Sequence, residues 1–357
     1  MRFRLDDEQQ ALAAAVRGVV ERRAQQCDLR AAIERGYDRE LWSALCGQVG
    51  VAALAIPAEL GGAGATSFET HVVLDALGGS LTPTPLPGTF IAMRAVQLAA
   101  DGAAQERLLP SLASGDEIGA LAWADHAGRW SREPALSAST DAGSWSLTGT
   151  SALVVDGGRA DVLLAVAETG AGAALFEARG GVVVSTPALD PTLDLATVTF
   201  DRAPATPLGP VPLDDLLAEA ACAVTALQVG GAQAALDQTV RYLGERQQFG
   251  RPLGSFQALK HRAADMLVDV ETARSISWWA AYAVAHRQPG YLRRASAAKA
   301  WCSEAFGRVA AEMIQLHGGI AITWEHDAHL YFKRAHATAQ LFGDPRMHRS
   351  RAARHAT

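Results

Sequence analysis

Residues 241–266 read RYLGERQQFGRPLGSFQALKHRAADM. The stretch closes one helical pattern, breaks at Phe249–Ser255 and opens a second helical pattern. The first pattern begins near Leu213 and ends near Glu245, which at 1.5 Å per residue gives a helix of about 48 Å. A helix of this length is typical of a bundle rather than of an ordinary globular domain. The sequence therefore predicts a helical bundle in its C-terminal part.

The remaining sequence divides into zones of different composition. We expect further bundle helices over residues 255–285, 292–316 and 327–340. Short runs rich in Val and Thr follow one another between residues 117 and 204, with Gly and Asp between them, and this pattern predicts a small antiparallel barrel or sandwich. The segment DRAPATPLGP, residues 201–210, is interpreted as the turn that closes it.

The N-terminal zone is rich in Ala and Leu and predicts helices, among them one over residues 67–77. The loop GGSLTPTPLPG follows, and its prolines are expected to exclude regular structure. The predicted fold class is thus α+β multidomain. Its expected parts are an N-terminal α-helical domain over residues 1–113, a middle antiparallel β-barrel or sandwich over 114–205, and a C-terminal four-helix bundle over 206–357.

Composition excludes several classes of protein. The 357 residues are 49% hydrophobic and 20% charged, which is enough to bury a core. A net charge of −6 gives no reason to expect binding to nucleic acid or to an anionic membrane. No run of about 18 uncharged apolar residues indicates a membrane span, and the N-terminus lacks a secretory pattern. We expect a cytoplasmic protein.

The cysteines and histidines indicate no metal centre. The cysteines are scattered and form no CxxC pair, so we expect reduced thiols. His326 and His329 are spaced by one helical turn, but no third ligand accompanies them, and we predict no metal. The four cysteines are Cys27, Cys46, Cys222 and Cys302.

Two stretches carry candidate binding chemistry. Arg246, Phe249 and Gln257 would offer a guanidinium, a flat ring and an amide around one turn, a set suited to a nucleotide pyrophosphate. The alternative is a plain helix connection with a surface arginine. The second stretch places Gln315 one helical turn before Gly318 and Gly319, where a ligand can approach the backbone closely. A glycine pair is equally a helix stop.

In this order, four segments together resemble the acyl-CoA dehydrogenase family. They are PAELGG at residues 57–62, the β zone, RQQFGRPLGSFQ at 246–257 and QLHGGIAITWEHD at 315–327. The resemblance implies a helical domain, a β-barrel and a four-helix bundle, with FAD between the barrel and the bundle and a dimer completing the site. It also implies oxidation of an acyl-CoA to the trans-2-enoyl-CoA. A carboxylate takes the α proton, the β hydride goes to flavin N5, and an electron-transferring flavoprotein or similar acceptor reoxidises the flavin.

The resemblance also assigns cofactor residues. Arg246 and Phe249 match the family's FAD-contacting Arg and Phe, and Gln257 matches the Gln that faces the cofactor. Gln315, Gly318 and Gly319 match the loop that touches the FAD of the neighbouring subunit. A helical scaffold without flavin would not need this set.

The expected catalytic base is missing. The family's usual Glu aligns with Phe342, whose ring cannot take a proton, although the backbone N–H of that residue can still donate to the thioester carbonyl. Glu219 lies one residue from the position where some relatives carry the base, and Asp344 lies two residues beyond Phe342. Both are candidate bases. The alternatives are an acidic residue of a first helical turn and an Asp-Pro turn.

The β zone departs from the family as well. Its TEPxxGS-like loop and W-x-T segment are replaced by residues 124–130 and 153–155, which lack the matching hydroxyl groups. Weaker flavin retention is expected, or a cofactor site completed by another subunit. The chain is similar to the partner subunits of heterotetrameric members that act on steroid-type CoA esters; a homodimer or homotetramer is the alternative. Small residues at 229–232 predict a wide acyl pocket.

Overall fold

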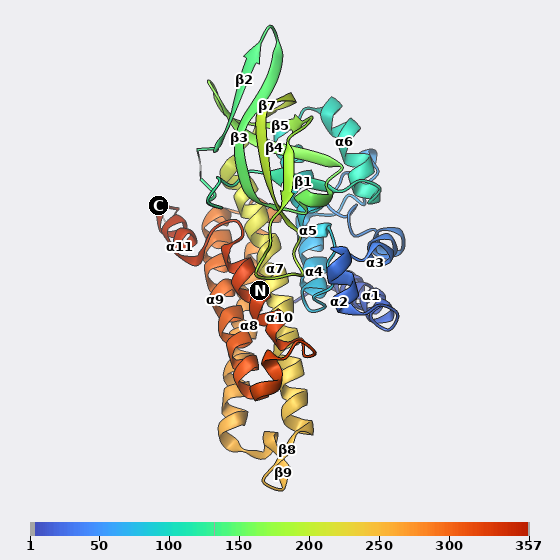
Figure 1. Ribbon diagram of the computed structural model, residues 1–357, viewed down its shortest axis with the longest axis vertical. Helices are drawn as coiled ribbons and strands as arrows, with labels where there is room; N and C mark the ends of the chain where they lie inside the picture. The colour runs from blue at the N-terminus through green and yellow to red at the C-terminus, as the bar shows by residue number, and fades with distance from the viewer. Residues whose placement is uncertain (1–3, 132, 356–357) are drawn as a thin grey trace. The chain divides into compact units, whose positions relative to one another are not determined.

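The computed structural model describes residues 4–131 and 133–355, which form helices, then strands, then helices again (Figure 1). The chain divides into two compact units. One contains Met1–Val20, His71–Leu81 and Ala221–Thr357, and the other contains Glu21–Thr70 and Thr82–Ala220. No helix among the described residues is long and apolar enough to cross a membrane.

The N-terminal helices confirm the expected helical zone. The predicted helix at 67–77 is α4, but the proline-rich loop ends sooner than expected, because α5 already begins at Leu86 with Pro87 in its first turn. Proline is tolerated there, since its missing N–H would have no helical partner anyway. The helices are α1 (Asp7–Ala24), α2 (Leu29–Arg35), α3 (Arg39–Ala44), α4 (Ser67–Gly78), α5 (Leu86–Ala99) and α6 (Gly102–Ser114).

The strands close into a ring and confirm the expected barrel. In order around the ring, β4, β2, β3, β7 and β5 pair with their neighbours, and β5 pairs again with β4. Two pairings differ from the antiparallel expectation, because β1 and β2 both run parallel to β4. The strands are β1 (Gly119–Ala122), β2 (Leu136–Asp141), β3 (Ser144–Val155), β4 (Val162–Thr169), β5 (Gly172–Ala178), β6 (Val182–Ser185) and β7 (Leu195–Pro210).

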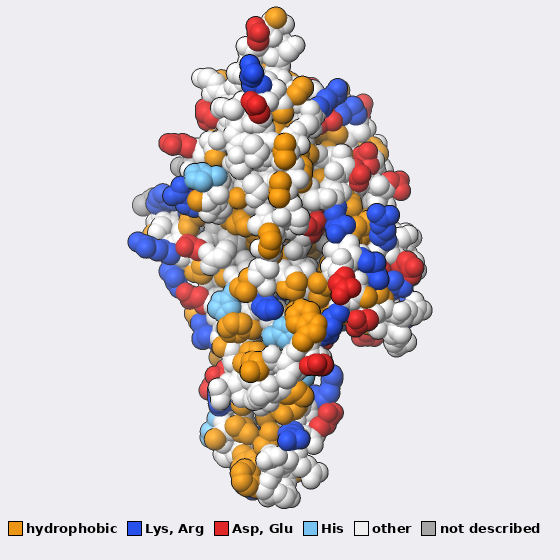
Figure 2. All heavy atoms as spheres, in the orientation of Figure 1, with side chains coloured by type: hydrophobic (Ala, Val, Ile, Leu, Met, Phe, Trp, Pro, Cys, Tyr) orange, Lys and Arg blue, Asp and Glu red, His pale blue; other side chains and the backbone are white. Residues whose placement is uncertain are grey.

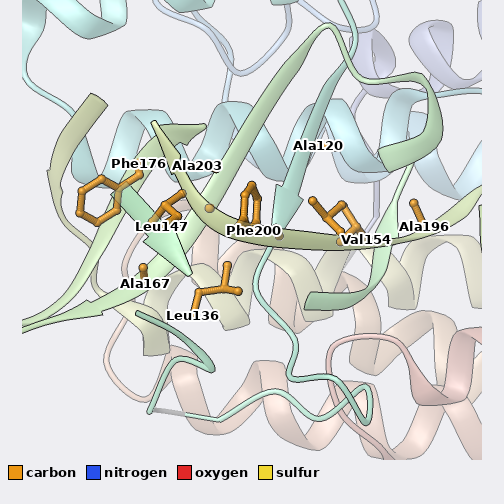
Figure 3. Close-up of a cluster of buried hydrophobic side chains, with 12 residues drawn as sticks. Ala120, Leu136, Leu147, Val154, Ala167, Phe176, Ala196, Phe200 and Ala203 are labelled. Atoms are coloured by element: carbon orange, nitrogen blue, oxygen red, sulfur yellow. The ribbon is translucent and has the colours of Figure 1, made fainter. Parts of the chain in front are cut away.

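A single cluster of apolar side chains fills the barrel (Figure 3). Phe176 of β5 and Phe200 of β7 are its largest members, and Leu136 of β2 and Leu147 of β3 belong to it as well. Each such side chain stabilises the fold by about 1.5–3 kcal/mol relative to an exposed one. Many of the other members are alanines, and together these side chains form the packed interior that a small barrel has.

The predicted closing turn at residues 201–210 is wrong. This segment is the second half of β7, which pairs with β3 as far as Ala205 and with β5 as far as Pro210. The pairings of β7 with β3 and with β5 both contain register shifts, and Arg202 has a positive φ of 47°. These irregularities allow the turn-forming residues to remain within the strand. A strand with such bulges accommodates prolines that a regular central strand would exclude.

The C-terminal helices agree with the expected bundle, and Figure 1 shows α8, α9 and α10 side by side. One feature has no counterpart among the expected elements, the short hairpin formed by β8 and β9. A final helix, α11, covers the basic tail. The elements are α7 (Leu213–Glu245), β8 (Gln247–Gln248), β9 (Arg251–Pro252), α8 (Gln257–Ala285), α9 (Tyr291–His317), α10 (Ala328–Gln340) and α11 (Pro345–Arg354).

The small residues of α7 do not line a wide pocket. A Cβ at Gly230 would lie 2.0 Å from the backbone oxygen of Asp75, and a Cβ at Gly231 would lie 2.6 Å from the Phe306 ring. These glycines let α4 and α9 pack closely against α7. The expectation of a wide acyl pocket from this segment is therefore wrong, because neighbouring helices occupy the space that the missing side chains leave.

Beside the barrel, Asp156 is a buried carboxyl group in an unfavourable setting. It follows β3 with φ 58°, and its Oδ2 accepts a hydrogen bond of 2.9 Å from the Gly88 N–H. Burial raises the pKa of Asp156 to about 8, and the nearby charge of Asp194 acts in the same direction. The group is thus neutral in the folded protein at pH 6 and ionised in the unfolded chain.

Replacing Asp156 with Asn is expected to make the protein more resistant to alkaline pH. In the folded state the carboxyl pKa is raised, so the native chain loses stability as pH increases from about 4, the unfolded value, to about 8. Asparagine does not ionise, tolerates a positive φ and can accept the same N–H. The difference in free energy of unfolding should grow by about 1.4 kcal/mol per pH unit across this window. Urea melts at several pH values measure it, and parallel pH profiles for the two proteins would contradict it.

Candidate functional site

The hairpin after α7 presents the first predicted set of binding residues. Its tip is Phe249 (φ 54°) followed by Gly250 (φ 76°), two positive φ values that a tight two-residue hairpin turn requires. The Phe249 side chain is 89% exposed. Arg246, just before the hairpin, and Gln257, the first residue of α8, are exposed as well. This segment therefore places a ring, a guanidinium and an amide at the surface.

Local contacts make the hairpin a defined structure. The Leu253 N–H donates to the Arg246 carbonyl at 2.8 Å, which closes the hairpin onto the end of α7. The Arg251 guanidinium lies 4.0 Å from the centre of the Phe256 ring, and that ring meets Phe249 edge-on at 6.2 Å. Arg251 is thus engaged in a cation–π contact at the hairpin base.

The second predicted set lies where α9 ends. Gln315 is exposed in the last turn, and Gly318 has φ 66° and ψ −146°, a conformation that only glycine adopts readily. Apart from the adjoining residues of the chain, no described atom lies within 4 Å of where a Cβ would be at Gly318 or Gly319. The loop is therefore an open stretch of backbone beside an amide side chain.

An aromatic contact that sequence analysis missed joins the ends of α7 and α9. The rings of Tyr242 and His317 stack with their centres 4.4 Å apart, and the Tyr242 hydroxyl donates to the His317 carbonyl at 3.3 Å. Burial lowers the pKa of His317, so the imidazole is neutral and its Nδ1 donates to Met313 O at 2.8 Å. Both predicted stretches thus lie at the same end of the bundle, although neither aromatic residue carried a sequence signal for this.

His326 and His329, the pair considered above as metal ligands, make other contacts. His326 Nδ1 accepts from the Ala328 N–H at 3.1 Å, and His329 stacks on Trp324 with the ring centres 5.2 Å apart. Across residues 4–131 and 133–355, no group of His, Cys, Asp or Glu has the arrangement of a metal site.

Exposed apolar side chains surround this end of α9. Figure 2 shows hydrophobic side chains at the surface of the lower part of the bundle. The loop after α9 contributes Ile320, Ile322 and Trp324, which are 46%, 76% and 55% exposed. Large exposed apolar groups in one place are typical of a surface that another molecule covers.

Asp344, the first candidate base, caps a helix. Its Oδ1 accepts a 2.6 Å hydrogen bond from the Met347 N–H, the expected role of Asp at the N-terminus of a helix such as α11. Phe342, two residues earlier, has φ 55° and is 5% exposed. The Phe342 carbonyl accepts a hydrogen bond of 2.9 Å from His348 Nε2.

Glu219, the second candidate, is held in an ion pair. It is 3% exposed near the start of α7, and its Oε1 accepts from the Arg94 guanidinium at 2.7 Å. Arg94 also donates to Gln97 at 2.6 Å, and Gln97 in turn donates to the Ala55 carbonyl at 2.8 Å. The carboxylate thus anchors a hydrogen-bonded chain that ties α7 to α5 and to the segment before α4.

Known proteins match this chain over nearly its whole length. Residues 6–116 match the family model of the acyl-CoA dehydrogenase N-terminal domain, and residues 213–357 match that of the C-terminal domain. Acyl-CoA dehydrogenase IpdE2 of Mycobacterium tuberculosis is 41% identical over 342 residues, which cover 95% of this chain and 94% of the relative. The chain belongs to the acyl-CoA dehydrogenase family.

Solved structures of the family agree with the fold. A variant of the Tcur3481-Tcur3483 steroid ACAD is 31% identical with a TM-score of 0.90, covering 98% of this chain and 97% of that one. The ChsE4-ChsE5 complex from Mycobacterium tuberculosis is 29% identical with a TM-score of 0.89, covering 99% and 98%. Acyl-CoA dehydrogenases are FAD-dependent oxidoreductases, and the resemblance stated from the sequence is confirmed.

The residues at the end of the bundle fit the FAD of an acyl-CoA dehydrogenase. A guanidinium, two amides and an open glycine backbone are donors suited to the negative charge of a pyrophosphate, and the exposed Phe249 offers a face to a flat ring system. In this family FAD accepts the hydride of the substrate. The assignment of these six residues to FAD stays a prediction.

The loop over residues 124–130, which the resemblance aligns with the family's TEPxxGS-like loop, is closed on itself. Asp125 Oδ1 accepts from the N–H groups of Ala127 and Arg129, and its Oδ2 accepts from the Arg129 side chain at 2.8 Å. A Cβ at Gly128 would meet the Leu153 side chain at 2.7 Å. An Asp-centred turn and a leucine thus occupy the loop and the strand that carry hydroxyl groups in the family pattern.

Proposed function

We propose that this chain is a subunit of an FAD-dependent acyl-CoA dehydrogenase that converts an acyl-CoA thioester to the 2-enoyl-CoA together with a paralogous subunit. The observation that carries the proposal is a contrast within one chain. Side chains of the type that holds a cofactor, namely Arg246, Phe249, Gln257 and Gln315, are exposed at the end of the bundle, while the sequence motif aligns Phe342 with the family's catalytic carboxylate. A chain that keeps the cofactor-type side chains and lacks the catalytic carboxylate is suited to sharing its active site with another subunit.

The reaction removes the α proton and the β hydride of the acyl group, which leaves a double bond between the two carbons. A carboxylate must take the proton, and a paralogous subunit would supply it if neither Glu219 nor Asp344 does. An electron-transferring flavoprotein or a similar acceptor would then reoxidise the flavin. A steroid-type CoA ester is the substrate class we favour, because one similar structure is named a steroid ACAD. A cytoplasmic location remains a prediction from the sequence.

The second candidate function is a non-catalytic partner subunit with a degraded active site. Three features favour it: the sequence motif aligns Phe342 with the expected base, Asp344 caps α11, and Glu219 is paired with Arg94. The turn at Asp125 favours it too, since residues 124–130 carry no hydroxyl side chain where the family pattern has them. On this alternative the chain binds and completes an active partner.

Expression with and without a paralogue tests the proposal. We expect little flavin absorbance from the chain alone. We expect a yellow complex when a family member encoded by a neighbouring gene is co-expressed with it. The complex should bleach when a steroid-type acyl-CoA is added. A complex that stays colourless, or a yellow complex that does not bleach with any acyl-CoA, would contradict the proposal.

Matched variants separate the two functions. Phe249→Ala in this chain should lower the FAD affinity of the complex about tenfold, equivalent to about 1.4 kcal/mol, without changing its thermal stability, because the side chain is 89% exposed. Glu219→Gln and Asp344→Asn are made separately. Loss of bleaching in one of them, with flavin content and thermal stability unchanged, identifies a base in this chain, whereas bleaching in both indicates that the partner supplies the carboxylate.

A further inference from the structure

Lys299 of α9 is a fully buried lysine outside the predicted site. Its side chain is 0% exposed, which is rare for lysine unless the amine is paired. The Nζ donates to the Ser303 hydroxyl and to the carbonyls of Ala339 and Gly343, each at 3.1 Å. The ammonium therefore uses every one of its donors inside the protein.

Both carbonyls belong to the turn that contains Phe342. Ala339 lies in the last turn of α10, and Gly343 lies just before α11, so the amine joins the two ends of the segment between them. Within this segment Phe342 has φ 55°, a left-handed conformation that is costly for a residue with a side chain and needs outside support, whereas Gly343 adopts its φ of 104° freely. Lys299 and His348 supply it, the latter through the Phe342 carbonyl.

The lysine is itself held in place from α7 and α10. Gln228 donates to Ser303 at 3.0 Å and to the Thr338 hydroxyl at 3.3 Å, and all of these groups are buried. Burial lowers the pKa of Lys299 to about 7, which shows how unfavourable this position is for an ammonium. A buried methionine or leucine would pack here without that cost. A lysine here is explained by the carbonyls that it holds.

We propose that Lys299 is a positioning residue of the acyl-CoA dehydrogenase site, and that it fixes the 340–344 segment through the carbonyls of Ala339 and Gly343. The role rests on the proposed function, because in this family the segment carries the backbone N–H at position 342 that meets the thioester carbonyl. A turn held at both ends presents that peptide in one orientation, and a misplaced donor stabilises the transition state less.

Lys299→Met tests the role against loss of stability alone. Methionine approximates the length of lysine but leaves the buried Gly343 carbonyl and the partly buried Ala339 carbonyl without this donor. The matched control is Val309→Ala, which removes buried volume from the same helix, away from the segment. Both are measured in the complex with the paralogous subunit, by amide hydrogen exchange, flavin content, kcat and KM.

In Lys299→Met we expect exchange of residues 340–344 to accelerate at least about tenfold while the rest of α9 exchanges as in the control. The kcat should fall at least about tenfold with flavin content unchanged. Unchanged exchange at 340–344 would overturn the proposal, and so would a kcat equal to that of Val309→Ala. If the wild-type complex holds no flavin and is inactive, the proposed function fails and this role with it, while the exchange data still show whether Lys299 holds the segment.

Discussion

Arg94→Met is expected to lower the free energy of unfolding by about 3–5 kcal/mol, because it leaves the Glu219 carboxylate buried without its partner. The carboxylate is 3% exposed and Arg94 is its ion-pair partner at 2.7 Å. Arg94 also donates to Gln97, which in turn donates to the Ala55 carbonyl. The substitution therefore also removes the contact that orients Gln97 toward Ala55. Chemical denaturation followed by circular dichroism measures the change.

The matched control is Arg107→Met in the exposed pair with Glu177. Arg107 is 47% exposed, and an exposed pair contributes about 0–1 kcal/mol. The double variant Arg94→Met/Glu219→Gln should recover part of the loss, because it no longer buries an unpaired charge. Equal effects of the two arginine substitutions would contradict the buried ion pair as the anchor of this region. The comparison also bears on catalysis, since an anchoring carboxylate is a poor choice of proton acceptor.

Gly230→Ala is expected to destabilise the bundle by about 3 kcal/mol, the upper part of the range for overpacking. The new Cβ would lie 2.0 Å from the Asp75 carbonyl oxygen and 3.1 Å from the Gly78 Cα, and both are backbone atoms. No side chain can rotate away to relieve the contact, so the helices must separate. Thermal unfolding of the purified chain reports the effect.

Gly307→Ala in α9 is the control for the effect of replacing a glycine with alanine inside a helix. Apart from its own helix, no described atom lies within 4 Å of the position of its Cβ, and alanine stabilises a helix interior by about 0.5–1 kcal/mol relative to glycine. The two substitutions should therefore shift the melting temperature in opposite directions. A stabilising effect at Gly230 would show that α4 and α7 do not pack this closely, and would restore the possibility of a wide pocket there.

Much of the fold follows from local sequence because its elements are long or strongly patterned. The helix predicted from Leu213 to Glu245 has those bounds in the structure, since few breakers interrupt it. The segment at 201–210 was interpreted wrongly for a physical reason: prolines and glycines mark turns, yet here bulges accommodate them within β7. The hairpin at Phe249 was seen only as a break, because strands of two residues carry no periodic signal.

The six candidate cofactor residues were named from the resemblance, and the structure places them at one end of the bundle. What joins the two stretches, the stack of Tyr242 on His317, had no pattern in the sequence because it depends on how α7 and α9 pack. The partners of Glu219 and Asp344 were equally hidden. Arg94 lies 125 residues from Glu219 along the chain, and a separation of that size leaves no local trace.

The sequence by itself determined the order of helical, β and helical zones and the family to which the chain belongs. Periodicity and short motifs depend only on residues that are close together in the chain. Only the tertiary structure decided what the buried groups do. Glycines in α7 serve close packing, Glu219 serves an ion pair, and Lys299 holds the turn around Phe342. The cause is the same in each case: the role of a buried residue is set by the atoms that pack around it, and those come from distant parts of the chain.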